Sequence, residues 1–566
     1  MNTAGACIVQ RDFTVLLEKD HPGFELARGY LNQYAEMIKT PAHYHTYRIT
    51  PLSLWNAAAK GATADEIIES LRLISRWDLP SGVVADIQMW VNRYGALKLY
   101  SLPNGDCLVL ECSNKTTNTL HLLVNEGKLD KLDSGFTWEW IDERHIRIPA
   151  RFRGLLKQEL ARLGYPVQDE VGYHRGGELS FGLRSVLPGG RPFALRSYQS
   201  EGVEAFAGEG EHDGGSGVLV LPCGGGKTVI GLGVMDKFQC ETLILTSNVT
   251  SVRQWIAEIL NKTTLSPHDV GEYSGEKKEV RPVTVSTYQI LTHRGRKEEG
   301  FKHMGLFNER DWGLIIYDEV HLLPAPVFRA TADIQATRRL GLTATLVRED
   351  GCERDVFSLI GPKRYEVPWR NLEESGFIAE VECQEVRIPM PSDLQGYYLQ
   401  AEGREKFRIA AENPLKINVL QQLVKRHAGR QILIIGQYLD QLHRVAEVLD
   451  VPLITGSLPQ QERARRYQAF KDGEISVLVV SKVANFAVDL PDASVAIQIS
   501  GSFGSRQEEA QRLGRILRPK EDGKGAYFYT LVSEDTREQD FAMRRQMFLV
   551  EQGYDYAVTI ERGEGA

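Results

Sequence analysis

Apolar residues in the later part of the chain fall into short continuous runs that alternate with amphipathic stretches. These runs lie at residues 218–221, 243–245, 283–286 and 314–317, and again at 432–435, 477–480, 495–499 and 527–532. Short apolar runs without an alternating polar face are typical of parallel strands that helices cover on both sides. The stretch from residue 191 onward is too long for one such sheet. It therefore predicts an α/β fold with two doubly wound domains in tandem.

The pattern before residue 190 is mixed. Residues 65–74 and 84–94 place apolar side chains at helical spacing, and Thr63 with Glu66 can form a capping box. Residues 97–100 and 107–111 have the pattern of two short strands around a turn. We expect a mixed α+β region that ends near the glycine- and proline-rich stretch 185–192. Basic residues recur through 147–163, where they form either a DNA-contacting face or an ordinary solvated helix face.

The composition is that of a globular protein. With 566 residues, of which 42% are hydrophobic and 25% charged, the chain has room for roughly three to four domains. It has neither a run of about 18 apolar residues nor a signal-peptide pattern, so we expect a cytoplasmic protein without a membrane segment. The seven cysteines form no C-x-x-C pair, which argues against an iron–sulfur cluster. A net charge of −8 argues against binding to nucleic acid by bulk charge but leaves room for a local basic groove.

A candidate phosphate loop follows the first apolar run. It comprises Leu221, Pro222, Cys223, Gly224, Gly225, Gly226, Lys227 and Thr228. Glycines between a strand and a helix allow backbone N–H groups to surround phosphate oxygens. In such a loop Lys227 reaches the β- and γ-phosphates of ATP, and the Thr228 hydroxyl binds Mg²⁺. Leu221 stands where the usual spacing has its first glycine, and the alternative interpretation is a glycine-rich turn without a ligand.

Two adjacent carboxylates follow the apolar run at 314–317. Asp318 and Glu319 stand at the tip of a predicted strand, where a second anchor for Mg²⁺ has to lie if the phosphate loop is real. Asp318 suits that role, and Glu319 suits the residue that orients and deprotonates the attacking water. The alternative is a pair of solvated charges at a sheet edge.

These two motifs and residues 511–518 (QRLGRILR) resemble motifs I, II and VI of superfamily 2 helicases and translocases. The resemblance implies two RecA-like motor domains with ATP and Mg²⁺ as cofactors. It assigns ATP binding to Arg196, Gln199, His321 and Asp489, DNA binding to Arg253, Ser286, Thr287, Tyr288, Ser481 and Lys482, and coupling of the two to Thr343, Ala344, Thr345 and Gln511. Arg515 and Arg518, three apart and so on one helix face, are implied to stabilise charge on the γ-phosphate.

Further segments resemble the XPB family in particular. Arg348, Glu349 and Asp350 match its R-E-D signature, which implies a contact with the DNA junction. The likeness covers about residues 190–560, with weaker likeness before. It implies an XPB-type N-terminal domain (1–130), a reduced damage-recognition domain (131–190), the ATP-binding helicase domain 1 (191–372) and the C-terminal helicase domain 2 (373–566). The segment 393–414 is short where the family has a thumb-like insertion.

The resemblance implies an ATP-dependent DNA helicase with 3′–5′ polarity that acts at junctions of single- and double-stranded DNA in repair. Three alternatives remain: a double-stranded DNA translocase that does not separate strands, an RNA helicase, and a non-catalytic ATP-binding scaffold that recruits a repair nuclease. Glu319 argues against the scaffold, because a simple ATP switch needs no group to activate water. A nuclease or other repair partner is expected and, in a bacterium, association with the nucleoid.

Overall fold

A computed structural model shows the fold. It describes residues 5–39, 43–101, 107–113, 117–129, 136–208, 214–222, 224–294, 301–335, 337–344, 353–367, 372, 375, 381–481, 493–501, 525–543 and 556–560. The chain divides into two compact units, Met1–Leu221 with Gly226–Glu366, and Pro222–Gly225 with Val367–Ala566. No helix within the described ranges is long and apolar enough to cross a membrane.

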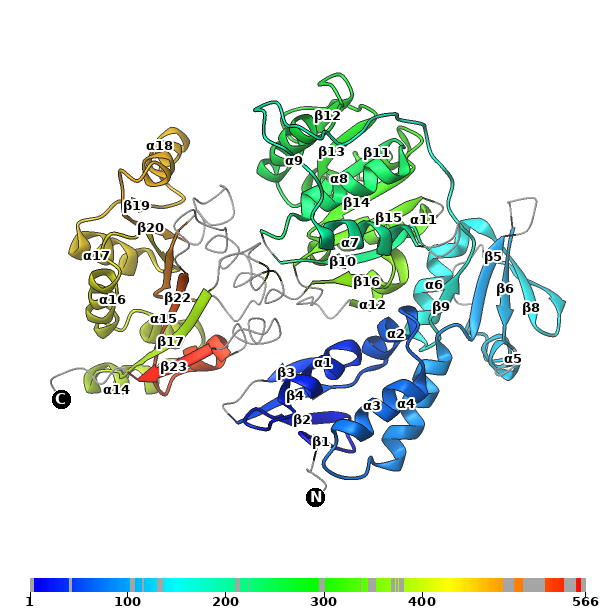
Figure 1. The fold of residues 1–566 in the computed structure, drawn as a ribbon, viewed down its shortest axis with the longest axis horizontal. Coiled ribbons are helices and arrows are strands. Elements are labelled where there is room, and N and C mark those ends of the chain that lie inside the picture. Colours follow the sequence, from blue (N-terminus) through cyan, green and yellow to red (C-terminus); the bar gives the residue numbers. More distant parts are fainter. Residues whose placement is uncertain are drawn as a thin grey trace. The chain divides into compact units, whose positions relative to one another are not determined.

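The first unit begins with a small antiparallel sheet and four helices (Figure 1). The sheet has the order β1-β2-β4-β3, from β1 (Cys7–Val9), β2 (Thr14–Glu18), β3 (Glu36–Lys39) and β4 (Tyr44–Arg48). The helices are α1 (Phe24–Tyr34), α2 (Pro51–Ala59), α3 (Ala64–Ile74) and α4 (Ser81–Arg93). The predicted capping box is confirmed: Glu66 N–H donates to Thr63 Oγ1, and Thr63 N–H donates to Glu66 Oε2.

A second, five-stranded sheet follows with the order β7-β8-β6-β5-β9. It is built from β5 (Leu97–Ser101), β6 (Cys107–Cys112), β7 (Glu139–Asp142), β8 (His145–Pro149) and β9 (Val167–Asp169), with helices α5 (Thr117–Asn125) and α6 (Arg153–Arg162). The boundary that the sequence predicts after residue 130 falls inside this sheet. β5 and β6 precede residue 130, yet β6 pairs with β8 and β5 with β9.

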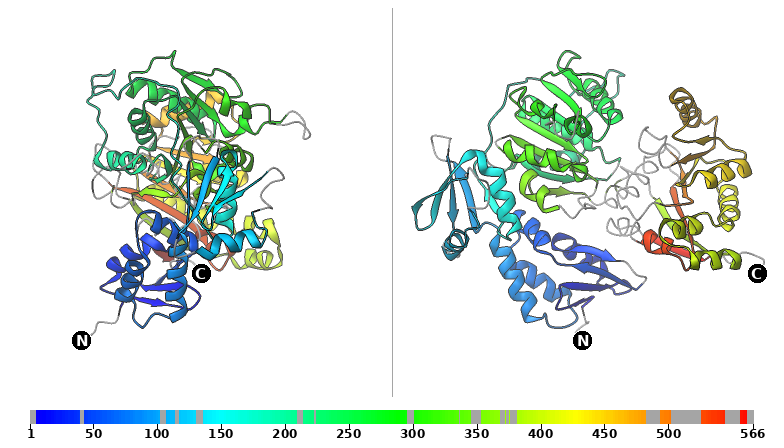
Figure 2. Two further views of the ribbon diagram at one scale, coloured as in Figure 1. Left: turned by 90° about the vertical axis from the view of Figure 1, so that its right-hand side faces the viewer. Right: turned by 180° about the vertical axis from the view of Figure 1, so that it is seen from behind.

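A seven-stranded sheet completes the first unit, and its paired strands all run parallel. The order β12-β13-β11-β14-β15-β10-β16 joins β10 (Ser216–Val220), β11 (Thr242–Thr246), β12 (Val270–Tyr273), β13 (Val283–Thr287), β14 (Leu314–Asp318), β15 (Arg338–Thr343) and β16 (Lys363–Glu366). Helices α7 (Ser197–Ala207), α8 (Lys227–Phe238) and α9 (Val249–Lys262) pack side by side. The green ribbons of Figure 2 show the strands running between layers of helices.

The opposite face of this sheet has its own apolar core. Side chains of β10, β11 and β14 pack there against α10 (Tyr288–Leu291), the 3₁₀ segments η3 (Met304–Asn308) and η4 (Val320–Leu322), α11 (Ala325–Asp333) and η5 (Val356–Ile360). The short turn α12 (Glu353–Asp355) precedes η5. The domain is therefore doubly wound, as the apolar runs predict.

The second unit holds another parallel seven-stranded sheet, with the order β19-β20-β18-β21-β22-β17-β23. Its strands are β17 (Val381–Ile388), β18 (Ile432–Gly436), β19 (Leu453–Ile454), β20 (Val477–Ser481), β21 (Val495–Gln498), β22 (Ala526–Ser533) and β23 (Tyr556–Ile560). Its helices include α16 (Leu415–Arg426), α17 (Leu439–Leu449) and α18 (Gln460–Lys471). The short segment 393–414 forms most of α14 (Ser392–Gln400) and α15 (Gly403–Ala411). The prediction of two tandem α/β domains is confirmed.

Candidate nucleotide site

The phosphate loop connects the end of β10 to the start of α8. Lys227 is the first residue of α8, and Gly226 is its N-cap. Gly224 and Gly226 have φ values of 83° and 77°, a left-handed conformation that glycine adopts without steric cost. α8 therefore begins directly after the glycines, and the N–H groups of its first turn are available for an anion. Thr228 stands in this first turn, and Cys223 lies outside the described residues.

The two acids stand at the carboxyl end of β14, a central strand of the sheet. Lys227 Nζ lies 2.5 Å from Glu319 Oε1, which joins the loop to the acid pair. Glu319 has a left-handed backbone with φ 52°, a conformation that costs energy for a residue with a Cβ and is often found at functional sites. Parallel sheets bind ligands at the carboxyl ends of their strands, and the contact between Lys227 and Glu319 lies at this edge.

Asp318 and Glu319 have opposite titration behaviour. Burial and the neighbouring Glu319 charge raise the pKa of Asp318 to about 6, against the opposing effects of Lys227 and of an N–H donated by Trp255. Burial alone would raise the pKa of Glu319 too, but the Lys227 ammonium and His321 outweigh it and lower that pKa. Glu319 is therefore the better-stabilised anion, and Asp318 is the acid that gains more from a cation.

His321 links the acids to the next strand. Its Nδ1 lies 2.7 Å from Thr343 Oγ1 and 3.6 Å from Glu319 Oε2. Thr343 ends β15 and is buried, as is Ala344 after it. The carboxyl ends of β14 and β15 are thus connected by side chains as well as by the sheet.

Gln199 lies beside the phosphate loop, on the first turn of α7. Its Oε1 accepts the Arg196 N–H at 2.9 Å, and the side chain is buried. A Cβ at Gly226 would lie 2.4 Å from Gln199 Nε2, so the amide packs directly on the loop. The Arg196 guanidinium is exposed and donates to Tyr198 Oη at 3.2 Å.

The residues assigned to DNA by resemblance divide into exposed and buried ones. Arg253 is exposed on α9 and pairs with Glu276. Ser286, Thr287 and Tyr288 are buried at the end of β13, and the Tyr288 hydroxyl donates to the backbone oxygen of Asp318 at 2.9 Å. The Tyr288 side chain therefore contacts the backbone at the end of β14 and is not exposed on the surface. Ser481, at the end of β20, is also buried.

Several predicted site residues lie outside the described residues. They are Cys223, Thr345, Arg348, Glu349, Asp350, Lys482, Asp489, Gln511, Arg515 and Arg518. Their assignments stay predictions from the sequence.

One residue at the site was not predicted. Trp255 Nε1 donates to Asp318 Oδ2 at 2.9 Å. In the sequence it stands at helical spacing with Val252 and Ile259, and all three are buried. A tryptophan on the apolar face of a helix looks like a core residue, and no local signal shows where its N–H points.

The donor set suits Mg²⁺. Thr228 and Asp318 offer oxygen ligands close to the loop, which is the ligand type that this hard cation prefers. Within the described ranges, no group of three or more His, Cys, Asp or Glu side chains could hold a metal ion. An ion bound through one carboxylate and one hydroxyl, completed by phosphate oxygens and water, is the usual way in which proteins hold Mg²⁺.

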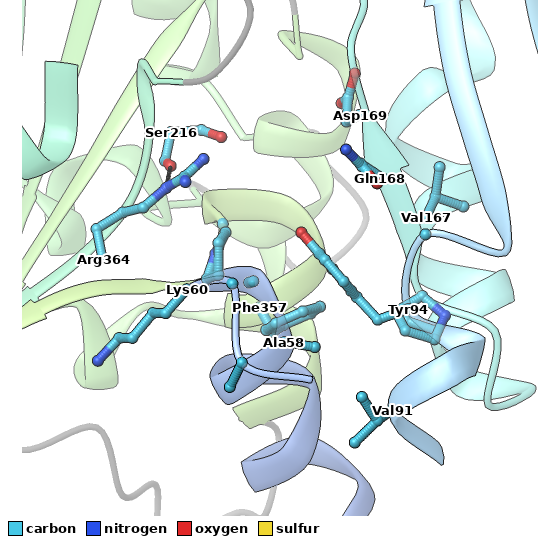
Figure 3. Close-up of a pocket in the computed structure, with 18 of the residues that line it drawn as sticks. Ala58, Lys60, Val91, Tyr94, Val167, Gln168, Asp169, Ser216, Phe357 and Arg364 are labelled. Carbon is cyan, nitrogen blue, oxygen red and sulfur yellow. Dashed lines mark hydrogen bonds between the residues drawn. The ribbon is translucent and has the colours of Figure 1, made fainter. Parts of the chain in front are cut away.

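A cavity of about 1500 Å³ lies in another part of the first unit (Figure 3). It is lined by residues of all three sheet regions, among them Lys60, Tyr94, Gln168 and Arg364. Ser216 also lines it and is the first residue of β10, whereas the phosphate loop follows the last residue of that strand. The cavity therefore lies at the amino ends of the strands, away from Lys227.

Comparison with known proteins covers the whole chain. The family model "ERCC3/RAD25/XPB C-terminal helicase" matches residues 372–564, "Type III restriction enzyme, res subunit" matches 192–348, and "Helicase conserved C-terminal domain" matches 7–133. The chain is 49% identical over 564 residues to a DNA 3′-5′ helicase XPB of Kineococcus radiotolerans, covering 98% of this chain and 96% of the relative. It is 47% identical over 556 residues to a protein of the same name from Mycobacterium tuberculosis, with 98% of each covered. A TFIIH helicase/translocase subunit XPB/SSL2 of Saccharomyces cerevisiae is 33% identical, with 97% of this chain and 71% of the relative covered.

The two parallel sheets, the phosphate loop and the carboxylates at the end of β14 define an ATP-dependent motor of the superfamily 2 helicase class. Within that class the level and extent of identity are decisive. The chain belongs to the XPB family of helicases.

Proposed function

We propose that the chain couples ATP hydrolysis to 3′–5′ movement along DNA and acts at junctions of single- and double-stranded DNA during repair. The ion pair between Lys227 and Glu319, with Asp318 beside it at the end of β14, carries this proposal. It joins a phosphate-binding lysine to the acid that a hydrolase needs, whereas a scaffold that only binds ATP needs no such acid. Family membership supports the substrate and the polarity.

In this proposal each residue of the site has a step. Lys227 exchanges its contact with Glu319 for the β- and γ-phosphate oxygens of ATP, and this exchange frees the Glu319 carboxylate. Glu319, whose pKa is lowered, then orients a water molecule and accepts its proton. Thr228 and Asp318 would hold Mg²⁺, which would neutralise charge on the phosphates. Gln199 packs on the loop where the adenine of ATP is expected from the resemblance.

The second unit completes the motor in this proposal. Arg515 and Arg518 stabilise charge on the γ-phosphate when the two motor domains close on ATP, while Asp489 binds ATP and Gln511 couples ATP to DNA. Arg253, Lys482 and the R-E-D segment at 348–350 face DNA, whereas the buried Ser481 side chain does not. These assignments rest on the matching motifs in the sequence. A repair nuclease as partner and association with the nucleoid belong to the same proposal.

One observation favours a second candidate, a translocase that moves along duplex DNA without separating its strands. The segment expected to form a thumb consists of α14 and α15, each of nine residues. A short thumb offers less surface for holding strands apart.

Two assays on the full chain test these proposals. ATP hydrolysis is measured with and without DNA, and unwinding is measured on 3′-tailed, 5′-tailed and blunt duplexes. We expect DNA-stimulated hydrolysis and unwinding of the 3′-tailed duplex, both lost in Lys227→Ala. Displacement of a third strand from a triplex without unwinding of any duplex would favour the translocase. If the chain binds ATP but does not hydrolyse it with any of these DNAs, the non-catalytic ATP-binding scaffold is the remaining interpretation.

A further inference from the structure

Helix α9 lies between an exposed basic residue and the nucleotide site. Arg253 and Trp255 are two residues apart, so they point to opposite sides of the helix. The Arg253 side chain is 54% exposed, whereas Trp255 is 1% exposed. From the buried side, Trp255 Nε1 donates to Asp318 Oδ2 at 2.9 Å.

A glycine on the phosphate-loop helix makes room for this indole. A Cβ at Gly231 of α8 would lie 2.6 Å from Trp255 Cη2. The indole therefore packs on α8 at a position where no side chain blocks it, and its Nε1 reaches Asp318. Gly231 is four residues after Lys227 and so faces the same side of α8.

The partner of this N–H sets Trp255 apart from two other buried tryptophans. Trp312 Nε1 donates to the backbone oxygen of Leu306 at 2.9 Å, and Trp55 Nε1 donates to the backbone oxygen of Trp90 at 3.2 Å. Both are ordinary solutions for a buried indole, whose N–H needs any acceptor. Trp255 instead donates to a side-chain carboxylate in the candidate site.

We infer that Trp255 is a positioning residue: it orients the Asp318 carboxylate for Mg²⁺ and, through α9, links the DNA-facing side of the domain to the metal site. This inference rests on the proposed function. By occupying Oδ2, the indole leaves Oδ1 of Asp318 for the cation. A shift of α9 on binding DNA at its exposed side moves the indole and with it the carboxylate. Hydrogen-bond partners of metal ligands commonly change metal affinity about 10- to 100-fold.

The test compares Trp255→Phe with the matched variant Trp312→Phe in the full chain. Each variant removes one indole N–H and part of one buried ring from the same domain. The Mg²⁺ concentration for half-maximal binding of a fluorescent ADP analogue is measured by anisotropy, which needs no catalysis. We expect this concentration to rise about tenfold or more in Trp255→Phe and to stay at the wild-type value in Trp312→Phe. Stimulation of ATP hydrolysis by a 3′-tailed duplex is expected to fall in Trp255→Phe alone.

Gly231→Ala provides a second, independent variant. The added methyl group displaces the Trp255 ring, and alanine favours a helix interior over glycine, so a loss of Mg²⁺ affinity cannot be ascribed to an unfolded helix. Because phenylalanine lacks the outer ring atoms, Gly231→Ala is expected to weaken Mg²⁺ binding in the wild type and to add little in Trp255→Phe. If the two substitutions act independently, so that their fold-changes in Mg²⁺ concentration multiply in the double variant, the coupling through the indole is wrong.

The outcomes separate this inference from the proposed function. A wild-type chain that neither binds the nucleotide with Mg²⁺ nor hydrolyses ATP contradicts the proposed function itself. If the wild type does both and Trp255→Phe needs no more Mg²⁺ than Trp312→Phe, Trp255 is a core residue and the inference is wrong. If Trp255→Phe needs more Mg²⁺ for nucleotide binding but its ATP hydrolysis is stimulated by DNA as in the wild type, the link to DNA through α9 is wrong.

Discussion

At the scale of single residues, the Lys227 ammonium and the Glu319 carboxylate neutralise each other in an ion pair. Both side chains are mostly buried, so either charge alone would be costly at this position. Their pairing keeps Glu319 ionised and ready to accept a proton. In the proposed mechanism ATP replaces Glu319 as the partner of Lys227, so that nucleotide binding and activation of Glu319 as general base are one event.

We expect Lys227→Ala to abolish ATP hydrolysis, because the phosphates lose their point charge. Glu319→Gln is expected to keep ATP affinity and to lose about 10²- to 10⁴-fold in kcat, since an amide cannot accept the proton of water. Single-turnover hydrolysis and nucleotide binding separate the two effects. A Glu319→Gln chain that turns over at close to the wild-type rate would remove Glu319 from the role of base.

The raised pKa of Asp318 predicts that Mg²⁺ binding depends on pH. The proton and Mg²⁺ compete for a carboxylate whose pKa is raised to about 6. The Mg²⁺ concentration for half-maximal nucleotide binding should therefore be level above about pH 7 and rise about tenfold by pH 5, one unit below that pKa. Protonation of the nucleotide's own phosphates is measured without protein and subtracted. An ordinary aspartate, with a pKa of about 3.9, would leave the corrected value nearly unchanged down to pH 5.

At the scale of elements, helix α6 buries two of its three basic residues. Arg153 Nη2 and Lys157 Nζ lie 2.9 and 2.7 Å from the two Asp169 oxygens, and all three side chains are less than 10% exposed. Lys157 also donates to Gln335 Oε1 at 3.0 Å, which joins this helix to the first motor domain. For Arg153 and Lys157 both interpretations of 147–163, a DNA-contacting face and a solvated helix face, are therefore wrong. Their charges hold α6 in place.

Asp169→Asn tests this network. Burial opposes ionisation of Asp169, but Lys157 and Arg153 outweigh it and lower its pKa, while burial lowers the pKa of Lys157 to about 8. Loss of the carboxylate leaves two buried cations without it, a change that typically costs about 3–5 kcal/mol. Hydrogen exchange of the α6 amides should show an opening free energy lower by that amount. Glu159→Gln, which breaks an exposed pair with Arg162 on the same helix, should cost less than about 1 kcal/mol.

The sequence predicts elements well where the signal is local. Apolar runs mark strands such as β10, β14 and β18, and the capping box at Thr63 marks the start of α3. β15 escapes prediction because it begins with Arg338 and Arg339. Arg339 is fully buried, and its guanidinium donates to the backbone oxygens of Leu359 and Gln335.

The candidate site shows the same limit. Lys227, Asp318 and Glu319 could be predicted because each stands in a short contiguous motif at a strand end. The contact of Trp255 with Asp318 and that of Lys157 with Gln335 could not, since the partners lie 63 and 178 residues apart in the sequence. Burial of Tyr288 likewise depends on tertiary packing.

At the scale of the whole molecule, we propose that hydrolysis in the first unit needs charges from the second. Arg515→Ala and Arg518→Ala are each expected to bind ATP nearly normally and to lose kcat, because these residues act when the motor domains close. An arginine of this kind contributes about 10³- to 10⁵-fold in related phosphoryl-transfer enzymes. Steady-state kinetics with saturating DNA separate kcat from KM. A raised KM with unchanged kcat in both variants would contradict the assignment.

The R-E-D segment predicts a substitution that affects strand separation more than ATP hydrolysis. Arg348, Glu349 and Asp350 follow the coupling motif at 343–345 closely, whereas the residues that hold ATP stand elsewhere in the sequence. Arg348→Ala is therefore expected to spare ATP hydrolysis more than unwinding, so that fewer base pairs open per ATP. A lost phosphate contact also makes DNA affinity less dependent on salt, and the slope of log affinity against log salt should flatten by about 0.7 to 0.9. ATP hydrolysis, unwinding and the salt slope are measured on the same preparation. If unwinding per ATP and the salt slope are both unchanged, these three charged residues belong to a solvated surface loop.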